Sequence, residues 1–277
     1  MLNTHIQNTV KGALAEDIGS GDVTARLIPE GQQATARVIS RENAVICGRE
    51  WFDAVFHALD PGMMITWQIR DGDAATPDQL LCTLSGNCRA LLSGERTALN
   101  FLQTLSGTAT RARQFHDRVS DLPVTILDTR KTLPGLRREQ KYAVRCGGCS
   151  NHRAGLYDAI LIKENHIQAC GAVGKAIEQA RLAAPGLPVE VEVENLAEMT
   201  EALAHRADIL LLDNFPEEEL RRAVHLNEGR ARLEASGGIT LENIRAIALT
   251  GVDYISVGAL TKDLKAIDLS MRIVIDR

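Results

Sequence analysis

The sequence contains no long hydrophobic run. No stretch approaches the roughly 18 consecutive apolar residues that a membrane-spanning helix needs. The first residues, Met1 to His5, also lack the positively charged start and the following apolar stretch of a secretory signal peptide. These two absences argue against a membrane protein and against a secreted one, and we expect a cytoplasmic protein.

An overall excess of positive charge is also missing. The chain has 31 Lys and Arg against 36 Asp and Glu, a net charge of −5, whereas a general nucleic-acid binder is usually basic. One segment departs from this balance. Residues 128–164 contain eight Lys and Arg and four Asp and Glu, which is a net charge of +4. A local excess of this kind suits a small anionic ligand.

The six cysteines do not form the pattern of a disulfide scaffold or of a zinc site. A chain of this size and class is not expected to depend on disulfides. Cys146 and Cys149 have CxxC spacing, but Cys82 and Cys88 are separated by five residues and do not fit as a second ligand pair. Two buried or loop thiols are the favoured interpretation of this pair, with metal or redox chemistry as the alternative.

Short apolar runs followed by reactive side chains dominate the second half of the chain. The run 124–127 reads as a buried strand and is followed by Asp128, Arg130 and Lys131, and then by the structure-breaking Pro134 and Gly135. Five further runs end in polar or glycine residues, and they cover 158–162, 189–193, 209–212, 231–235 and 252–257. Because helix-like segments separate them, these runs predict parallel strands of an α/β barrel whose ends share one catalytic face.

The first half of the chain has a different pattern of apolar residues. Helical periodicity over 4–16 and 51–59 alternates with short strand-like runs over 34–40, 44–47, 64–69 and 79–84. This order predicts a small α+β domain, with an antiparallel sheet and helices on one face. A strongly helical stretch over 89–119 follows, with Ser106-Gly107 as a candidate break. We place the first domain at 1–110 and the barrel at 111–267, with residues 268–277 as a candidate to pack back on the first domain.

Several longer motifs resemble those of the quinolinate phosphoribosyltransferase family. They are Glu95-Arg-Thr-Ala-Leu-Asn-Phe-Leu-Gln103, Asp128-Thr-Arg-Lys-Thr-Leu-Pro-Gly-Leu-Arg137, Asn151-His-Arg-Ala-Gly-Leu-Tyr-Asp158, Leu161-Ile-Lys-Glu-Asn-His166, Val189 to Asn195, Leu211-Leu-Asp-Asn214, Ala235-Ser-Gly-Gly-Ile239 and Ser256-Val-Gly-Ala-Leu260. The resemblance runs nearly end to end. It implies an open-faced α+β sandwich domain followed by an incomplete α/β barrel of about seven strands.

The resemblance also implies an activity and an assembly. The family transfers phosphoribose from phosphoribosyl pyrophosphate (PRPP) to quinolinate with Mg²⁺, and it releases pyrophosphate and CO₂. The product is nicotinate mononucleotide, an intermediate of de novo NAD biosynthesis. The family works as a homodimer, or as a hexamer built from three dimers, in which a helix arginine enters the neighbouring subunit's site. That arginine matches Arg96 here.

The residues present suit both substrates. Quinolinate carries two adjacent carboxylates, and burying them requires several cationic donors, which are Arg96, Arg130, His152, Arg153 and Lys163. Mg²⁺ and the ribose hydroxyls of PRPP favour carboxylates, for which Glu192 and Asp213 are the candidates.

The phosphate groups of PRPP require a different set of residues. The ribose phosphate suits the backbone amides of the last two strand ends, which comprise Ser236, Gly237, Gly238, Val257, Gly258 and Ala259. Thr129 is a further candidate for substrate binding. Lys131 or Lys163 would neutralise the departing pyrophosphate. Glu190 and Glu192 share strand parity, so both are expected to point into the barrel.

Two positions depart from the family pattern, and other functions stay open. Cys149 replaces the third glycine of a Gly-Gly-Gly sequence, which would cost about 1 kcal/mol if that position needs a positive φ. Lys262 and Asp263 stand where many relatives have a histidine, at the edge of the phosphate site. The alternatives are a related phosphoribosyltransferase with another ring acceptor, a Schiff-base aldolase that uses Lys163, and a non-catalytic protein that binds a phosphorylated metabolite.

Overall fold

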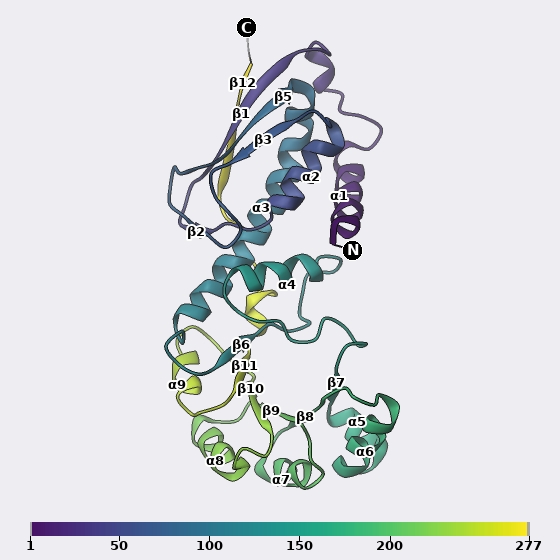
Figure 1. The fold of residues 1–277 in the computed structure, drawn as a ribbon, viewed down its shortest axis with the longest axis vertical. Helices are drawn as coiled ribbons and strands as arrows, with labels where there is room; N and C mark the ends of the chain where they lie inside the picture. Colours follow the sequence, from purple (N-terminus) through teal and green to yellow (C-terminus); the bar gives the residue numbers. More distant parts are fainter. Residues whose placement is uncertain (1, 276–277) are drawn as a thin grey trace. The chain divides into compact units, whose positions relative to one another are not determined.

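The computed structural model describes residues 2–275 and divides into two compact units (Figure 1). The first unit runs to Arg111 and takes up the chain again from Leu264, and the second covers Ala112–Asp263. Among the described residues, none of the helices combines the length and the apolar character needed to cross a membrane.

The first unit is built on a four-stranded antiparallel sheet in the order β12-β1-β5-β3. These strands are β1 (Gln33–Ser40), β3 (Met64–Trp67), β5 (Leu80–Asn87) and β12 (Leu269–Ile275), and β2 (Ala44–Val45) pairs separately with β4 (Ala74–Ala75). Ala34, Ala36 and Val38 of β1 are buried while the residues between them are exposed, which is the alternation of a sheet with one covered face. The strand β12 pairs with β1 from Ala34 to Ser40.

Three helices and one 3-10 turn accompany this sheet. They are α1 (Leu2–Ile18), the turn η1 (Ala25–Leu27), α2 (Arg49–Leu59) and α3 (Cys88–Asp117). The apolar face of α2 is buried through Trp51, Phe52 and Phe56. As the sequence predicted, this is a small α+β unit with an antiparallel sheet.

Helix α3 is continuous, so the break suggested at Ser106-Gly107 is wrong. The two small residues serve close packing instead. The Ser106 hydroxyl is buried, donates to the Cys47 carbonyl and accepts from the Cys47 amide. A Cβ at Gly107 would lie 2.2 Å from the carbonyl oxygen of Lys265, so no larger residue fits there.

The second unit is a six-stranded parallel sheet in the order β6-β11-β10-β9-β8-β7. Its strands are β6 (Thr125–Leu127), β7 (Ile160–Ile162), β8 (Val189–Val193), β9 (Ile209–Asp213), β10 (Arg232–Ser236) and β11 (Tyr254–Ser256). A parallel bridge between Leu127 and Ser150 adds a seventh position beside β6. The prediction of an incomplete α/β barrel is confirmed, with six full strands and one isolated bridge.

Helices alternate with these strands. They are α4 (Arg137–Cys146), α5 (Glu164–Cys170), α6 (Val173–Ala183), α7 (Leu196–Ala204), α8 (Glu217–Asn227), α9 (Ile244–Ala248) and the 3-10 turn η2 (Gly258–Leu260). Figure 1 shows the strands in an arc, with α5 to α9 along its outer side. This alternation follows from parallel pairing, because each strand must cross over before the next can run in the same direction.

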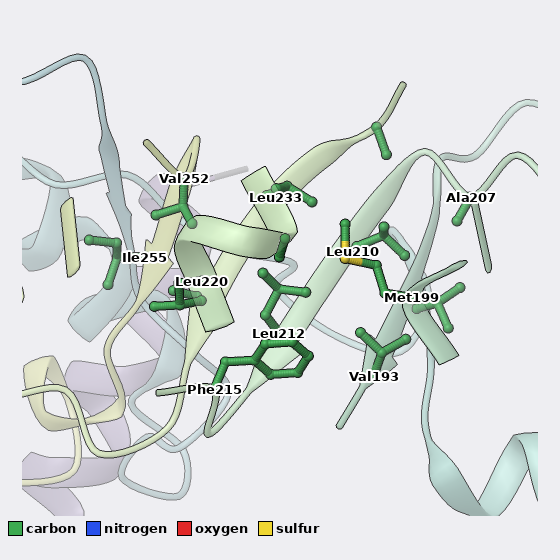
Figure 2. Packing of buried hydrophobic residues seen from close by; sticks show 14 of the residues in the cluster. Val193, Met199, Ala207, Leu210, Leu212, Phe215, Leu220, Leu233, Val252 and Ile255 are labelled. Atoms are coloured by element: carbon green, nitrogen blue, oxygen red, sulfur yellow. The ribbon is translucent and has the colours of Figure 1, made fainter. Parts of the chain in front are cut away.

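The core of the second unit lies between the strands and these outer helices. Val193, Leu210, Leu212 and Leu233 are at most 2% exposed and pack against helix residues such as Met199 (Figure 2). Burying each such side chain contributes about 1.5–3 kcal/mol. The alternate residues of the same strands point to the inner side of the arc, and this parity brings the polar side chains of several strands together.

Candidate active site

A cavity of about 430 Å³ opens at the carboxyl ends of the strands of the second unit. Nine predicted site residues line it, and they are Thr129, Arg130, Lys131, His152, Arg153, Lys163, Glu192, Asp213 and Ser236. The first three directly follow β6, and the others come from the ends of β7 to β10 or from the 151–153 loop. Residues spread over more than 100 positions of the chain therefore meet at one edge of the sheet, as parallel strand ends do in α/β barrels.

Two guanidinium groups dominate one wall of the cavity. The Nε of Arg130 is buried and has no hydrogen-bond partner among the described residues. Burial lowers the pKa of Arg153, and the positive charge of Arg130 lowers it further. The two cations are therefore close enough to repel each other. Because a buried, unpaired guanidinium nitrogen is costly, this wall favours an anionic ligand with several acceptor oxygens.

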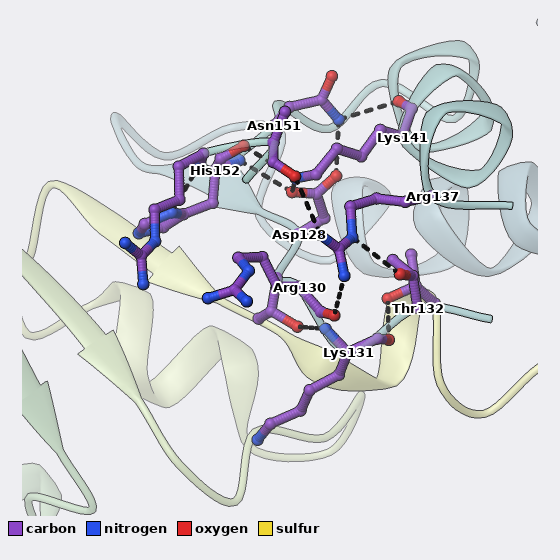
Figure 3. Close-up of polar contacts among 12 residues, drawn as sticks. Asp128, Arg130, Lys131, Thr132, Arg137, Lys141, Asn151 and His152 are labelled. Atoms are coloured by element: carbon purple, nitrogen blue, oxygen red, sulfur yellow. Dashed lines mark hydrogen bonds and ion pairs between the residues drawn. The ribbon is translucent and has the colours of Figure 1, made fainter. Parts of the chain in front are cut away.

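Asp128 holds the loop that carries His152 and Arg153. Its carboxylate is fully buried and accepts hydrogen bonds from the Lys141 ammonium at 2.5 Å, the Asn151 amide group at 2.7 Å and the backbone N–H of His152 at 2.9 Å (Figure 3). Lys141 also donates to the His152 carbonyl at 2.8 Å. One carboxylate therefore fixes two consecutive loop positions, Asn151 and His152, directly or through Lys141.

Arg137, at the start of α4, braces the neighbouring loop in the same way. Its guanidinium donates to the Thr132 hydroxyl at 3.1 Å, the Ala154 carbonyl at 3.2 Å and the Arg130 carbonyl at 3.5 Å (Figure 3). Arg137 and Lys141 are one helical turn apart, so α4 ties together the two loops that carry the arginines of the site.

His152 has both ring nitrogens engaged within the protein. Its Nδ1 accepts the Arg153 backbone N–H at 2.7 Å, and its Nε2 lies 3.0 Å from the Glu190 carboxylate. Burial lowers the pKa of His152, but the hydrogen bond and charge of Glu190 outweigh it and the net shift is upward. Since Nδ1 acts as an acceptor, the Nε2 proton is the one shared with Glu190.

A second group of lining residues, the acid and lysine wall, comprises Glu192, Asp213, Lys131 and Lys163. Lys163 and Glu192 form a short ion pair. Burial and the charge of Glu192 raise the pKa of Asp213, while the ammonium groups of Lys163 and Lys131 oppose that rise. Two carboxylates that repel each other in this way suit a divalent cation, and the two lysines suit a polyphosphate.

The strand ends predicted to bind phosphate lie beside these groups. Gly237 and Gly238 have φ values of 93° and 59°, and their N–H groups donate no hydrogen bond among the described residues. A Cβ at Gly237 would lie 2.1 Å from the Asn214 side-chain oxygen, so only glycine fits. A Cβ at Gly258 would meet the Lys131 side chain at 3.1 Å, which places that lysine directly over the end of β11.

Within the part of the chain that the structure describes, the other predicted site residues do not line this cavity. The Val257 side chain is in the core, and its N–H donates to the Leu127 carbonyl. Ala259 is half-buried within η2, and Arg96 is exposed on α3 of the first unit. Lys262 and Asp263 form an exposed ion pair.

Cys149 carries none of the backbone strain considered for it. It is not among the non-glycine residues with positive φ, and the left-handed conformation is taken by Gly148, at φ 97°. The Cys149 thiol is buried and donates to the Ala112 carbonyl, and burial raises its pKa to about 12. A thiol that stays protonated at neutral pH is a poor nucleophile and a poor metal ligand, which favours a packing role.

Sequence reasoning missed four lining residues, which are Leu161, Leu211, Glu234 and Ser256. Leu211 and Glu234 each lie two positions before a predicted site residue on the same strand, and Leu161 lies two positions before Lys163, which directly follows β7. The parity rule that paired Glu190 with Glu192 also pairs Glu234 with Ser236. The alternation of side chains along β10 therefore predicts that Glu234 points to the same side as Ser236.

The fold and the cavity together define a two-domain α/β-barrel enzyme for a polyanionic small molecule. Two family models match, the N-terminal domain of quinolinate phosphoribosyl transferase over residues 22–106 and its C-terminal domain over residues 108–272. The chain belongs to the quinolinate phosphoribosyl transferase family.

Individual relatives are similar in sequence to this chain along almost its whole length. A probable nicotinate-nucleotide pyrophosphorylase (carboxylating) of Synechocystis is 44% identical over 94% of this chain and 90% of its own length. One from Bacillus subtilis is 42% identical over 99% of this chain and 96% of its own length. The solved structure of the nicotinate-nucleotide pyrophosphorylase from Francisella tularensis has a TM-score of 0.95 at 47% identity, covering 98% of this chain and 97% of its own.

Proposed function

We propose that this protein transfers phosphoribose from PRPP to quinolinate and releases pyrophosphate, CO₂ and nicotinate mononucleotide. The observation that carries the proposal is the buried Arg130 Nε without a partner, facing a second guanidinium at Arg153 and lying in the same cavity as the acid and lysine wall. Such a cavity suits one ligand with adjacent carboxylates and another that combines phosphates with hydroxyls. Relatives named for this reaction support the assignment.

Quinolinate would bind between Arg130 and Arg153. Each guanidinium can donate two parallel hydrogen bonds to a carboxylate, and the planar ring would lie against the apolar side chains of Leu161 and Leu211. Glu190 and Asp158 offset part of the repulsion that Arg153 experiences from Arg130, and a bound dianion would relieve it further. The same wall would bind a neutral ring poorly, because the cations would then be desolvated without compensation.

PRPP would occupy the acid and lysine wall. Its ribose phosphate suits the free amides of Gly237 and Gly238, and its pyrophosphate suits Lys131 and Lys163. Glu192 and Asp213 fit a Mg²⁺ ion, since their mutual repulsion would fall when a divalent cation lies between them. Bound Mg²⁺ would supply positive charge to the pyrophosphate and so make it a better leaving group.

In the transfer step, the bond between the anomeric carbon and pyrophosphate breaks. Lys131 and Lys163 neutralise the departing oxygens, and the carboxylates of Glu192 and Asp213 stabilise the positive charge that develops on the sugar. The arginines hold quinolinate so that its ring nitrogen faces that carbon and captures it. Positioning of this kind is a large part of catalysis in a reaction between two bound substrates.

Loss of CO₂ follows from the charge on the ring. Once the nitrogen is a pyridinium, the electron pair of the broken carbon–carboxylate bond remains beside a positive charge. Exclusion of water favours this step, because a carboxylate loses CO₂ more readily without its hydration shell.

A second copy of the chain would complete the site. Arg96 is exposed on α3, and by its family position it would reach the partner's cavity and add a further cation for quinolinate. The assembly would then be a homodimer, or a hexamer built from three dimers.

The test is product formation from quinolinate and PRPP in the presence of Mg²⁺, with pyrophosphate, CO₂ and nicotinate mononucleotide measured separately. Formation of all three in equal amounts supports the proposal. Turnover of a monocarboxylate pyridine but not of quinolinate would indicate a relative with another ring acceptor. PRPP binding without any pyrophosphate release would indicate a non-catalytic binding protein.

A further inference from the structure

The lining of the substrate cavity includes part of an acidic cluster that the proposed reaction has not used. It consists of His152 and two carboxylates, Glu190 on β8 and Glu234 on β10, with one ligand atom from each residue lying within 4.8 Å of the others. Glu234 is 1% exposed and its side chain still lines the cavity. It lies two residues before Ser236 on the same strand, one layer deeper in the barrel.

The two carboxylates of this cluster have unequal hydrogen bonding. The single Nε2 proton of His152 is directed to Glu190 at 3.0 Å, whereas the Glu234 carboxyl is 3.7 Å from the same nitrogen. Oε1 of Glu234 is buried and has no partner among the described residues. A carboxylate oxygen in that position would carry uncompensated negative charge, so the neutral acid is the favoured form.

The electrostatics of the cluster point the same way. Burial raises the pKa of Glu234 to about 7, and the negative charge of Glu190 contributes to the rise. His152 and a hydrogen bond with Ser256 act in the opposite direction. Near neutral pH a large fraction of Glu234 is therefore an uncharged carboxylic acid with one O–H to donate.

We propose that Glu234 is the acid that delivers a proton to the ring carbon from which CO₂ has departed. This inference rests on the proposed function. It assigns a catalytic role to a buried group that lines the cavity and has one carboxyl oxygen without a hydrogen-bond partner among the described residues.

The step balances as follows. The bond between the ring carbon and its carboxylate breaks, CO₂ leaves, and the electron pair stays on the carbon beside the pyridinium nitrogen. The O–H of Glu234 transfers its proton to that carbon, which gives nicotinate mononucleotide and leaves Glu234 as a carboxylate. Glu234 regains a proton from solvent once the product has left. Without this donor the carbanion recombines with CO₂ before CO₂ leaves the cavity.

The other titratable groups of the cavity are less suited to this step. His152 has Nδ1 occupied by the Arg153 N–H and shares its Nε2 proton with Glu190. Lys163 is paired with Glu192, and the ammonium of Lys131 acts on Asp213 at the same wall. The protons of His152 and Lys163 already satisfy an acceptor, and the charge of Lys131 acts on Asp213, whereas the carboxyl of Glu234 has an oxygen with no partner among the described residues.

The test separates the two chemical steps in Glu234→Gln, which keeps the size and the donor but removes the acid. In a single turnover with quinolinate, PRPP and Mg²⁺, nicotinate mononucleotide formation should fall about 100-fold or more, the usual loss on removing a general acid. Pyrophosphate release should change little, and acid quenching should recover the phosphoribosylated dicarboxylate. Glu218→Gln, the same change on the exposed face of α8, should leave both products unchanged.

Two results would overturn the proposal. One is normal nicotinate mononucleotide formation in folded Glu234→Gln, and the other is a parallel loss of pyrophosphate and nucleotide, which would indicate a structural role. Absence of pyrophosphate from the unaltered protein would instead reject the proposed function.

A second measurement does not depend on the variant folding. In the unaltered protein, CO₂ release should fall as the pH rises through about 7, because the acid form of Glu234 is then lost, while pyrophosphate release should not follow the same profile. The groups that face Glu234, namely Glu190, His152 and Ser256, define this transition. Identical pH profiles for the two products would refute the assignment.

Discussion

The carboxylate of Asp128 accepts a hydrogen bond from the ammonium of Lys141 at 2.5 Å, and both side chains are buried at the base of the active-site loops. Burial raises the pKa of Asp128 in spite of the opposing hydrogen bond and charge of Lys141, so the ion pair does not fully offset the cost of desolvation. The value of this pair lies in the geometry that it imposes on the 151–153 loop.

Removing one member of that pair should destabilise the fold. Lys141→Met leaves a buried carboxylate without its cation, and we expect unfolding free energy to fall by about 3–5 kcal/mol in urea titrations. The double variant Asp128→Asn/Lys141→Met should lose less than the sum of the two single variants, because neither charge is then left unpaired. Additive losses would contradict a direct coupling between the two side chains.

Substitution of Arg130 should weaken the binding of quinolinate but not that of PRPP. Arg130→Lys keeps the charge but loses the fork of donors, and the KM for quinolinate should rise about 10- to 100-fold, which corresponds to about 1.4–2.8 kcal/mol. The KM for PRPP should change little. Arg138→Lys, on an exposed position of the neighbouring helix, is the matched control. Equal increases in both KM values would argue that Arg130 does not contact quinolinate.

Activity should require Mg²⁺ bound by Glu192 and Asp213. Chelation with EDTA should abolish pyrophosphate release, and added Mg²⁺ should restore it. Asp213→Asn should raise the Mg²⁺ concentration needed for half-maximal activity about tenfold or more, because one of two converging carboxylates is lost. An unchanged Mg²⁺ requirement in this variant would place the metal elsewhere.

A site shared between two chains can be tested by mixing inactive variants. Arg96→Ala and Lys131→Ala should each be inactive alone. A heterodimer of the two has one site with both residues intact, so random re-association of equal amounts should restore about a quarter of the activity. No recovery, under conditions where exchange of subunits is demonstrated, would argue that each chain forms its site alone.

Acid stability should depend on a surface pair away from the active site. Arg245 donates two hydrogen bonds of 2.8 Å to the Asp121 carboxylate, and this interaction lowers the pKa of Asp121 to about 2. A depressed folded-state pKa contributes stability above the unfolded value near 3.8, and that stability is lost as the pH falls towards 2. The Tm difference between the unaltered protein and Asp121→Asn should therefore be constant from pH 5 to 7 and shrink between about pH 4 and 2. A difference that persists at pH 2 would contradict the pairing.

Much of the fold was predictable from local pattern. The six apolar runs became β6 to β11, because near-continuous apolar segments between helical segments are stable only as the buried strands of a parallel sheet. The polar residues at their ends then had to meet at one edge. Where local pattern misled, at Ser106-Gly107, the small residues fitted a close approach of Lys265, a neighbour more than 150 positions later in the chain.

The sequence by itself determined the order of strands and helices, the identity of the cations and acids, and the edge of the sheet at which they gather, since these follow from periodicity and residue chemistry. Only the tertiary structure decided which of them interact. Three relationships depend on distances between side chains that are far apart in the chain. They are the pairing of Lys141 with Asp128, the repulsion between Arg130 and Arg153, and the position of the unpartnered Glu234 Oε1 beside Glu190. Burial and charge act through those distances, and no local pattern encodes them.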